Sequence, residues 1–147
     1  MKHPSDPQPR TLRELSRQKS LRLLGNVGIG RIAFISRAMP AIRLVSHIVN
    51  GDHLLIGCLY EPEIAAILGP RGTSMIVYQA NLVDPATHLG WNVVVSGRAA
   101  LMADPVVLAR VGPQLDGWKG GRADLVLRIQ PELVTGLHVG QYIEGSR

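Results

Sequence analysis

The chain has one cysteine, few aromatic residues and no long hydrophobic run, and each shortage excludes a class of protein. A single cysteine, Cys58, allows no intramolecular disulfide and no metal site built from several thiolates. The longest apolar stretches are interrupted by Arg43, His47 and Asp52, so none approaches the roughly 20 residues of a membrane helix. The first ten residues lack the apolar core of a signal peptide. We therefore expect a cytoplasmic protein with no membrane association.

Because aromatic residues make up only 4% of the 147 residues, the core must be built from Val, Ile, Leu and Ala. Hydrophobic residues account for 46% and charged residues for 18%, which is typical of a globular protein and not of a disordered one. The length fits a single domain. The richness in β-branched residues favours strands.

The net charge of +5 raises the question of nucleic-acid binding. The excess lies in the first 31 residues, where only Asp6 and Glu14 oppose seven basic residues: Lys2, Arg10, Arg13, Arg17, Lys19, Arg22 and Arg31. The rest of the chain carries nine bases and nine acids. We therefore interpret the basic segment as a solvated helix face and do not expect nucleic-acid binding.

The N-terminal segment predicts a flexible tail over residues 1–10, followed by a single domain over 11–147 that opens with a basic helix. Thr11 and Glu14 have the spacing of a capping box, and Ser16 and Ser20 are alternative start signals. The helix is expected to end at Gly25-Asn26 with a left-handed C-cap.

Alternating and apolar segments then predict strands joined mostly by turns. The strands are expected at 30–36, 41–49, 53–58, 73–80, 91–102, 123–130 and 133–139, and short helices at 61–68 and 105–111. Asn50-Gly51 is a strong hairpin signal, Gly97 predicts a bulge, and Asp104-Pro105 predicts an N-cap followed by a first helical proline. These elements predict a mostly antiparallel, closed or half-closed barrel of about six strands with short flanking helices.

Two residues invite a chemical reading. His47 could supply a proton or an axial haem ligand, but no second ligand is suggested, so we favour a buried strand histidine that makes a local hydrogen bond. No His or Cys spacing predicts a metal site. Cys58 is interpreted as a buried structural thiol.

Several segments, taken in order, resemble the flavin-binding split barrels of the pyridoxamine 5′-phosphate oxidase family, and the small actinobacterial-type branch of it in particular. Residues 23–34 (LLGNVGIGRIAF) are similar to its opening, and residues 40–47 (PAIRLVSH) to its second strand. The motif Gly90-Trp91…Gly97-Arg98-Ala99 carries most of the weight. The resemblance covers residues 11–139.

The resemblance implies a homodimer that binds FMN, or a deazaflavin, in a groove at the dimer interface. The cofactor-binding residues that it implies lie on the second strand, at the end of the third strand, on the following helix and on the fifth strand: Arg43, Leu44, Val45, Ser46, Gly57, Cys58, Glu63, Trp91 and Asn92. The implied activity is that of a flavin-dependent oxidoreductase.

This chain departs from the family pattern where the cofactor phosphate is expected. There, Gly57-Cys58 replaces Arg-Thr or Arg-Ser, and Glu63 replaces a lysine. On the second strand, Ser46 replaces an asparagine. A carboxylate in place of a cation repels a phosphate that carries about −1.5 to −2 charges. Alternatives to a flavin oxidoreductase are therefore a split-barrel dimer that has lost its flavin and binds another ligand or serves a structural role, and a haem-binding split barrel that uses His47.

Overall fold

The computed structural model describes residues 10–58, 62–69, 71–115 and 125–141, with the side chains of Pro62 and Glu63 left out. The strands of this part are β1 (Arg10–Leu15), β2 (Ile29–Ser36), β3 (Met39–Asn50), β4 (His53–Cys58), β5 (Thr73–Val83), β6 (Gly90–Leu101) and β7 (Leu125–Gln141). The helices are α1 (Arg17–Leu24), α2 (Pro62–Ile67), α3 (Pro105–Val111) and the 3-10 helix η1 (Gly112–Leu115).

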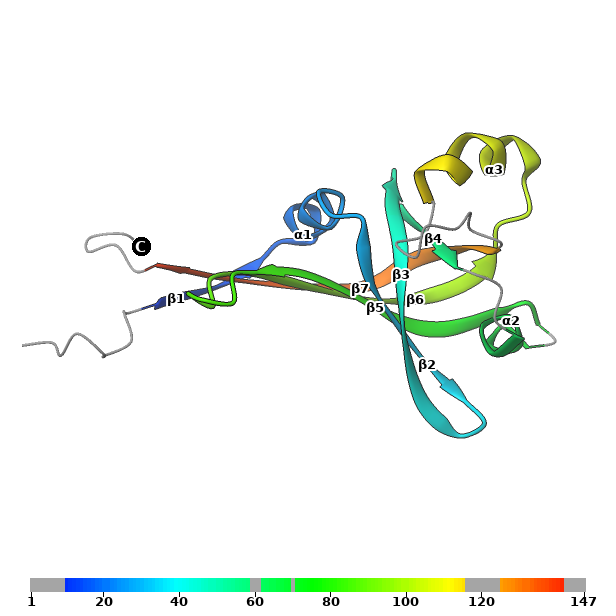
Figure 1. The fold of residues 1–147 in the computed structure, drawn as a ribbon, viewed down its shortest axis with the longest axis horizontal. Coiled ribbons are helices and arrows are strands. Elements are labelled where there is room, and N and C mark those ends of the chain that lie inside the picture. The colour runs from blue at the N-terminus through cyan, green and yellow to red at the C-terminus, as the bar shows by residue number, and fades with distance from the viewer. Residues whose placement is uncertain (1–9, 59–61, 70, 116–124, 142–147) are drawn as a thin grey trace, which may run out of the picture.

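The strands form an antiparallel sheet that closes on itself. Hydrogen-bonded neighbours run β7, β4, β3, β2, β5 and β6, and β6 then pairs with β7 to complete the ring. β1 continues the sheet by pairing with the C-terminal half of β7 (Figure 1). This arrangement confirms the expected split barrel, with seven strands instead of about six in the described residues.

β7 is the longest strand because it pairs with three others. Its first part pairs with β4, its last part with β1, and nearly its whole length with β6. We had expected two strands separated near Pro131. The strand continues because the register shifts there: Ser96 pairs with Leu133 and Gly97 with Pro131, so Glu132 is the extra residue of a bulge. The predicted irregularity at Gly97 is confirmed.

The expectation of one helix over 11–24 was wrong. Residues 10–15 form β1, whose Leu15 pairs with Gly136, and the helix begins only at Arg17. Ser16, one of the alternative start signals, is the N-cap and accepts a hydrogen bond from the Lys19 amide at 3.1 Å. Backbone pairing with β7 thus overrides the local capping-box signal. Gly25 ends the helix in the right-handed region, with φ −68°, so the left-handed C-cap was also wrong.

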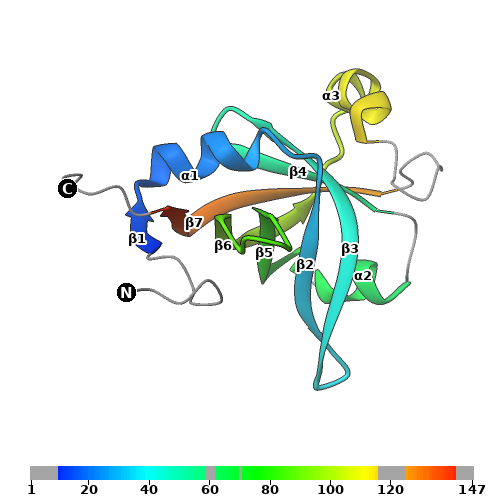
Figure 2. The same cartoon turned by 60° about the vertical axis from the view of Figure 1, so that its left-hand side comes forward.

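Two tight hairpins shape the part of the barrel formed by β2, β3 and β4. The predicted Asn50-Gly51 hairpin is confirmed, with Gly51 at φ 61° between β3 and β4. β2 and β3 are joined by Arg37 and Ala38, both with positive φ, as in a type I′ turn. Figures 1 and 2 show this second hairpin reaching beyond the rest of the barrel.

The core has two parts. The barrel interior holds most of the buried side chains, among them Ile32, Tyr78 and Val93. A smaller cluster of Leu55, Val111, Leu115 and Val126 lies where α3 and η1 cover β4 and β7. The predicted start of α3 is confirmed, since the Asp104 carboxylate accepts from the Val106 amide at 2.9 Å. In Figure 2, α1 and α3 lie along the upper side of the molecule and α2 lies below, beside β3.

Candidate functional site

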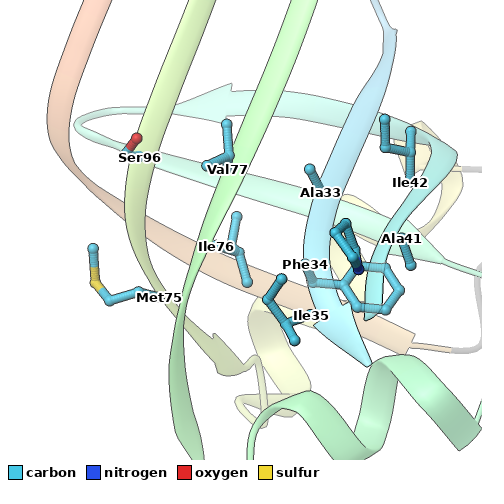
Figure 3. A pocket seen from close by; sticks show the side chains of 10 residues that line it. Ala33, Phe34, Ile35, Ala41, Ile42, Met75, Ile76, Val77 and Ser96 are labelled. Carbon is cyan, nitrogen blue, oxygen red and sulfur yellow. The ribbon is translucent and has the colours of Figure 1, made fainter. Parts of the chain in front are cut away.

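An open apolar groove of about 360 Å³ lies on the outer face of the barrel. Its lining comes from β2, β3, β5 and β6: Ala33, Phe34, Ile35, Pro40, Ala41, Ile42, Met75, Ile76, Val77 and Ser96. Figure 3 shows these side chains gathered over the four strands, with the Ser96 hydroxyl as the polar group at one side. The volume is within the usual range for small-molecule sites.

The groove exists because several strands carry apolar side chains on both faces. On β5, Ile76 and Tyr78 point into the barrel, whereas Met75 and Val77 point outward. An outward face of an antiparallel sheet is normally polar when water covers it. Here Ile35, Ile42 and Met75 are 63%, 62% and 48% exposed. Such patches are typical of ligand-binding grooves and of protein–protein interfaces.

A polar cluster continues the same outer face from the groove. Arg31 donates from Nη1 to Oε1 of Gln79 at 3.2 Å and to Oδ1 of Asn81 at 3.4 Å. Gln79 in turn donates from Nε2 to Oδ1 of Asn92. These bonds fix the orientation of the Gln79 and Asn92 amides and leave Nδ2 of Asn92 as a donor on this face. Arg31 lies two positions before the groove residue Ala33 on β2, and Gln79 lies two positions after the groove residue Val77 on β5. Along each strand, the polar residue is therefore about 7 Å from the groove residue.

A second cavity of about 450 Å³ lies further along the outer face, over β6, β7 and β1. Its lining residues are Glu14, Leu15, Asn92, Val94, Val134, Thr135, Gly136 and Leu137. The strand register brings them together, because Asn92 pairs with Leu137, and Leu137 pairs with Glu14. This cavity is more polar than the apolar groove, with a carboxylate, an amide and a hydroxyl in its lining.

His47 is a structural residue inside the barrel. Its Nε2 lies 2.8 Å from the Leu24 carbonyl oxygen, and its Nδ1 is hydrogen-bonded to the Tyr78 hydroxyl. Because a carbonyl only accepts, Nε2 carries the proton and Tyr78 donates to Nδ1. Burial lowers the pKa of His47 against the smaller opposing effect of the Leu24 carbonyl, and burial raises the pKa of Tyr78. The interpretation of His47 as a locally hydrogen-bonded strand residue agrees with this geometry.

Ser46 and Gly57, which the resemblance assigns to the cofactor, lie against η1. They pair across β3 and β4, and Ser46 donates its hydroxyl to the Leu115 carbonyl at 2.8 Å. A Cβ on Gly57 would lie 2.8 Å from both Cβ and the carbonyl oxygen of Leu115. Both residues are buried. The space over this pair is therefore taken by the chain itself.

The other expected site residues are dispersed. The Arg43 guanidinium lies 5.7 Å from the centre of the Phe34 ring, and neighbouring Leu44 is 37% exposed. Strand alternation places four more of the expected cofactor-binding residues. Val45, Cys58 and Trp91 lie inside the barrel core, and Asn92 lies on the outer face. The side chain of Glu63 lies outside the described residues. The structure thus does not bring the eight residues with described side chains into one site of a single chain.

Sequence reasoning suggested Arg31 as an alternative partner of the phosphate, but it missed the groove residues of β2 and β5 and the neighbouring Gln79. A signal was available in the lack of a plainly polar face on several strands, including β3, which indicates cover on both sides. The pattern on its own could not show which strands lie side by side.

The closed antiparallel ring of strands defines a split barrel. The chain belongs to the pyridoxamine 5′-phosphate oxidase family, whose model matches residues 16–138. It is 34% identical over 137 residues to the uncharacterized protein Rv0080 of Mycobacterium tuberculosis, covering 92% of this chain and 90% of that protein.

Solved structures agree on the fold. The FAD binding protein from Mycobacterium smegmatis has a TM-score of 0.64 and 19% identity, covering 86% of this chain and 97% of its own. An FAD-binding protein from Mesorhizobium loti has a TM-score of 0.67 and 19% identity, covering 90% and 100%. At these identities the likeness is one of fold.

The residues of this chain fit one end of a flavin and not the other. The apolar groove offers an apolar surface for a ring, with Ser96 and the Gln79–Asn92 pair at its margin. At Gly57, where the resemblance implies the phosphate, the Leu115 carbonyl presents an oxygen that repels an anion. The ring fits the outer face, and the phosphate does not fit beneath η1.

Among the described residues, no three His, Cys, Asp or Glu side chains are grouped to hold a metal ion. No helix of the described part is long and apolar enough to cross a membrane.

Proposed function

We propose that this protein is a flavin-binding, oxidoreductase-like homodimer that holds the ring of FMN or a deazaflavin in the apolar groove between two copies. The observation that carries the proposal is the 360 Å³ groove on an outward face where large apolar side chains stay exposed. Its support from related proteins is membership of the family and the flavin-binding neighbours of the same fold.

The chain's own residues would bind and orient the cofactor. Ala33, Ile42 and Val77 would exclude water from the ring, while Ser96 and the amides of Gln79 and Asn92 would hydrogen-bond its polar edge. When bound, the flavin supplies hydride transfer, which no side chain of this chain can perform.

The phosphate of the cofactor would lie at Arg31 and not beneath η1. Arg31 is an exposed guanidinium on the outer face, next in line to the groove on β2, and its Nη1 bonds to Gln79 and Asn81 orient it. A guanidinium is suited to a phosphate because its planar donors match the oxygen geometry.

The second copy would cover the exposed apolar side chains around the groove. Ile35, Met39 and Ile42 are each more than 60% exposed on β2 and β3. Covering such a patch removes apolar surface from water, at about 25 cal/mol per Å². A groove closed by a partner chain would also hold the ring on both sides.

The test is the visible absorption spectrum of freshly purified protein, followed by titration with FMN, FAD and a deazaflavin and by sedimentation equilibrium. We expect a flavin-like band or saturable binding with two sites per dimer. Ala33→Phe, which fills the groove, should abolish binding, whereas Val106→Phe on the outer side of α3 should not. A protein that sediments as a monomer, or that binds none of the three ligands, would overturn the proposal.

A second candidate is a split-barrel dimer that no longer binds flavin, and the packing of Leu115 over Ser46 and Gly57 favours it. A dimer that binds no flavin would support this candidate. A Soret band would instead favour the haem-binding alternative, although both ring nitrogens of His47 already have hydrogen-bond partners.

A further inference from the structure

The second cavity has a lining suited to a polar, positively charged ligand. Its charged lining residue is Glu14, whose carboxylate has no side-chain hydrogen bond or ion pair with the rest of the described chain. The Thr135 hydroxyl and Nδ2 of Asn92 provide further hydrogen-bonding groups. At about 450 Å³, the cavity has room for a small organic molecule.

Nearby cations of the described chain are directed elsewhere. Arg10 donates to the Thr87 carbonyl at 2.8 Å, and Arg31 donates to Gln79 and Asn81. Arg13 neighbours Glu14 on β1, but successive residues of a strand point to opposite faces. The carboxylate of Glu14 therefore sets the sign of the charge at this cavity.

The cavity adjoins the apolar groove along a single strand. Asn92, Val94 and Ser96 occupy alternate positions of β6; the first two line the second cavity, and Ser96 lines the groove. Alternate residues of a strand are about 7 Å apart. A molecule in the second cavity would thus lie beside a ring held in the groove.

We propose that the second cavity is the substrate subsite and takes an organic cation, with Glu14 as the residue that selects its charge. The role as a substrate subsite rests on the proposed function, because it requires a flavin ring in the neighbouring groove. The preference for a cation rests on the cavity alone and can be measured without any flavin.

Three probes of matched shape separate charge from size: benzylamine, which is protonated at neutral pH, benzyl alcohol and benzoate. Each would be titrated into the full-length protein, with amide NMR shifts of Asn92, Thr135 and Leu137 as the readout. We expect benzylamine to bind about fivefold more tightly than benzyl alcohol, which is the effect of a partly exposed ion pair of about 1 kcal/mol. Benzoate should bind more weakly than both.

Glu14→Gln keeps the shape of the side chain and removes its charge, so it should abolish the preference for benzylamine. Asp52→Asn, in the turn between β3 and β4, removes a carboxylate elsewhere and should leave the preference intact. Equal binding of the three probes, shifts confined to other residues, or a preference that survives Glu14→Gln would overturn the proposal. Because no flavin is present, failure of the flavin titration leaves this result unaffected.

Discussion

The hydroxyl of Tyr78 donates a hydrogen bond to Nδ1 of His47, and the two rings meet edge to face with centroids 5.0 Å apart. Both side chains are almost completely buried, and the other ring nitrogen of His47 binds the carbonyl at the end of α1. The pair therefore ties α1, β3 and β5 together through polar atoms that have no access to water.

Removal of the Tyr78 hydroxyl should destabilise the protein. Tyr78→Phe leaves the buried Nδ1 of His47 without a donor, which typically costs about 1–3 kcal/mol. Ser96→Ala removes a hydroxyl that has no partner among the described residues and should change the free energy of unfolding by less than about 0.5 kcal/mol. Urea unfolding of both variants gives the comparison, and equal stabilities would contradict the role of the pair.

Stability should decrease as the pH falls below about 6.5, the usual pKa of histidine. Above that pH, His47 is neutral in both states and contributes no pH dependence. Below it, His47 binds a proton in the unfolded chain but not in the native protein, because burial lowers the pKa of His47 in the fold. The loss continues down to the lowered native pKa, with a slope of at most about 1.4 kcal/mol per pH unit.

This pH dependence is measured by urea unfolding between pH 7.5 and 5.5. His47→Gln should flatten it, since the variant has no proton to bind at this position. An NMR titration of the His47 ring in the native wild-type protein provides an independent check. A ring that titrates at or above pH 6.5 would contradict the prediction.

Gly30 leaves the space that the Tyr78 hydroxyl occupies. A Cβ at Gly30 would collide with that hydroxyl and lie 2.7 Å from the Gln79 carbonyl oxygen. Gly30→Ala should therefore cost about 1–3 kcal/mol through overpacking. At Gly28, a Cβ meets nothing within 4 Å, so Gly28→Ala is the matched control. Thermal unfolding of both variants tests this, and equal melting temperatures would refute it.

Gly57 allows η1 to lie against β4. Gly57→Ala would place a Cβ 2.8 Å from the Leu115 carbonyl oxygen, so we expect η1 to shift and stability to fall by about 1–3 kcal/mol. Faster amide hydrogen exchange over residues 112–115 would report the shift. Gly112→Ala meets nothing within 4 Å and serves as the control. Unchanged exchange in Gly57→Ala would show that the contact does not hold η1.

With the phosphate at Arg31, as proposed, Glu63→Lys should leave the affinity for FMN unchanged. A several-fold rise would instead place the phosphate where the family resemblance implies it, because the variant puts a cation there in place of a carboxylate. Asp52→Lys makes the same change in charge at the opposite end of β4 and controls for net charge. FMN titration of both variants decides between two placements. An unchanged or lower affinity in Glu63→Lys would favour the phosphate position at Arg31.

Much of the fold could be predicted locally. Short apolar and alternating runs bounded by turn signals indicated β4 and most of β2, β3 and β6, because the local pattern acts within each strand whatever its partners are. Asn50-Gly51 correctly predicted the hairpin between β3 and β4, and Asp104-Pro105 correctly predicted the start of α3, since their backbone preferences act within a few residues. The site was harder to predict, because its residues come from strands far apart in the sequence.

The sequence by itself determined which segments are extended, where the chain turns, and that apolar residues occupy both faces of several strands. Only the tertiary structure decided that residues 10–15 form a strand beside β7, and that Leu115 lies over Ser46 and Gly57. It also brought Arg31, Gln79 and Asn92 into one cluster. The physical reason is that propensity and alternation act over a few residues, whereas pairing and cover depend on partners tens of residues away.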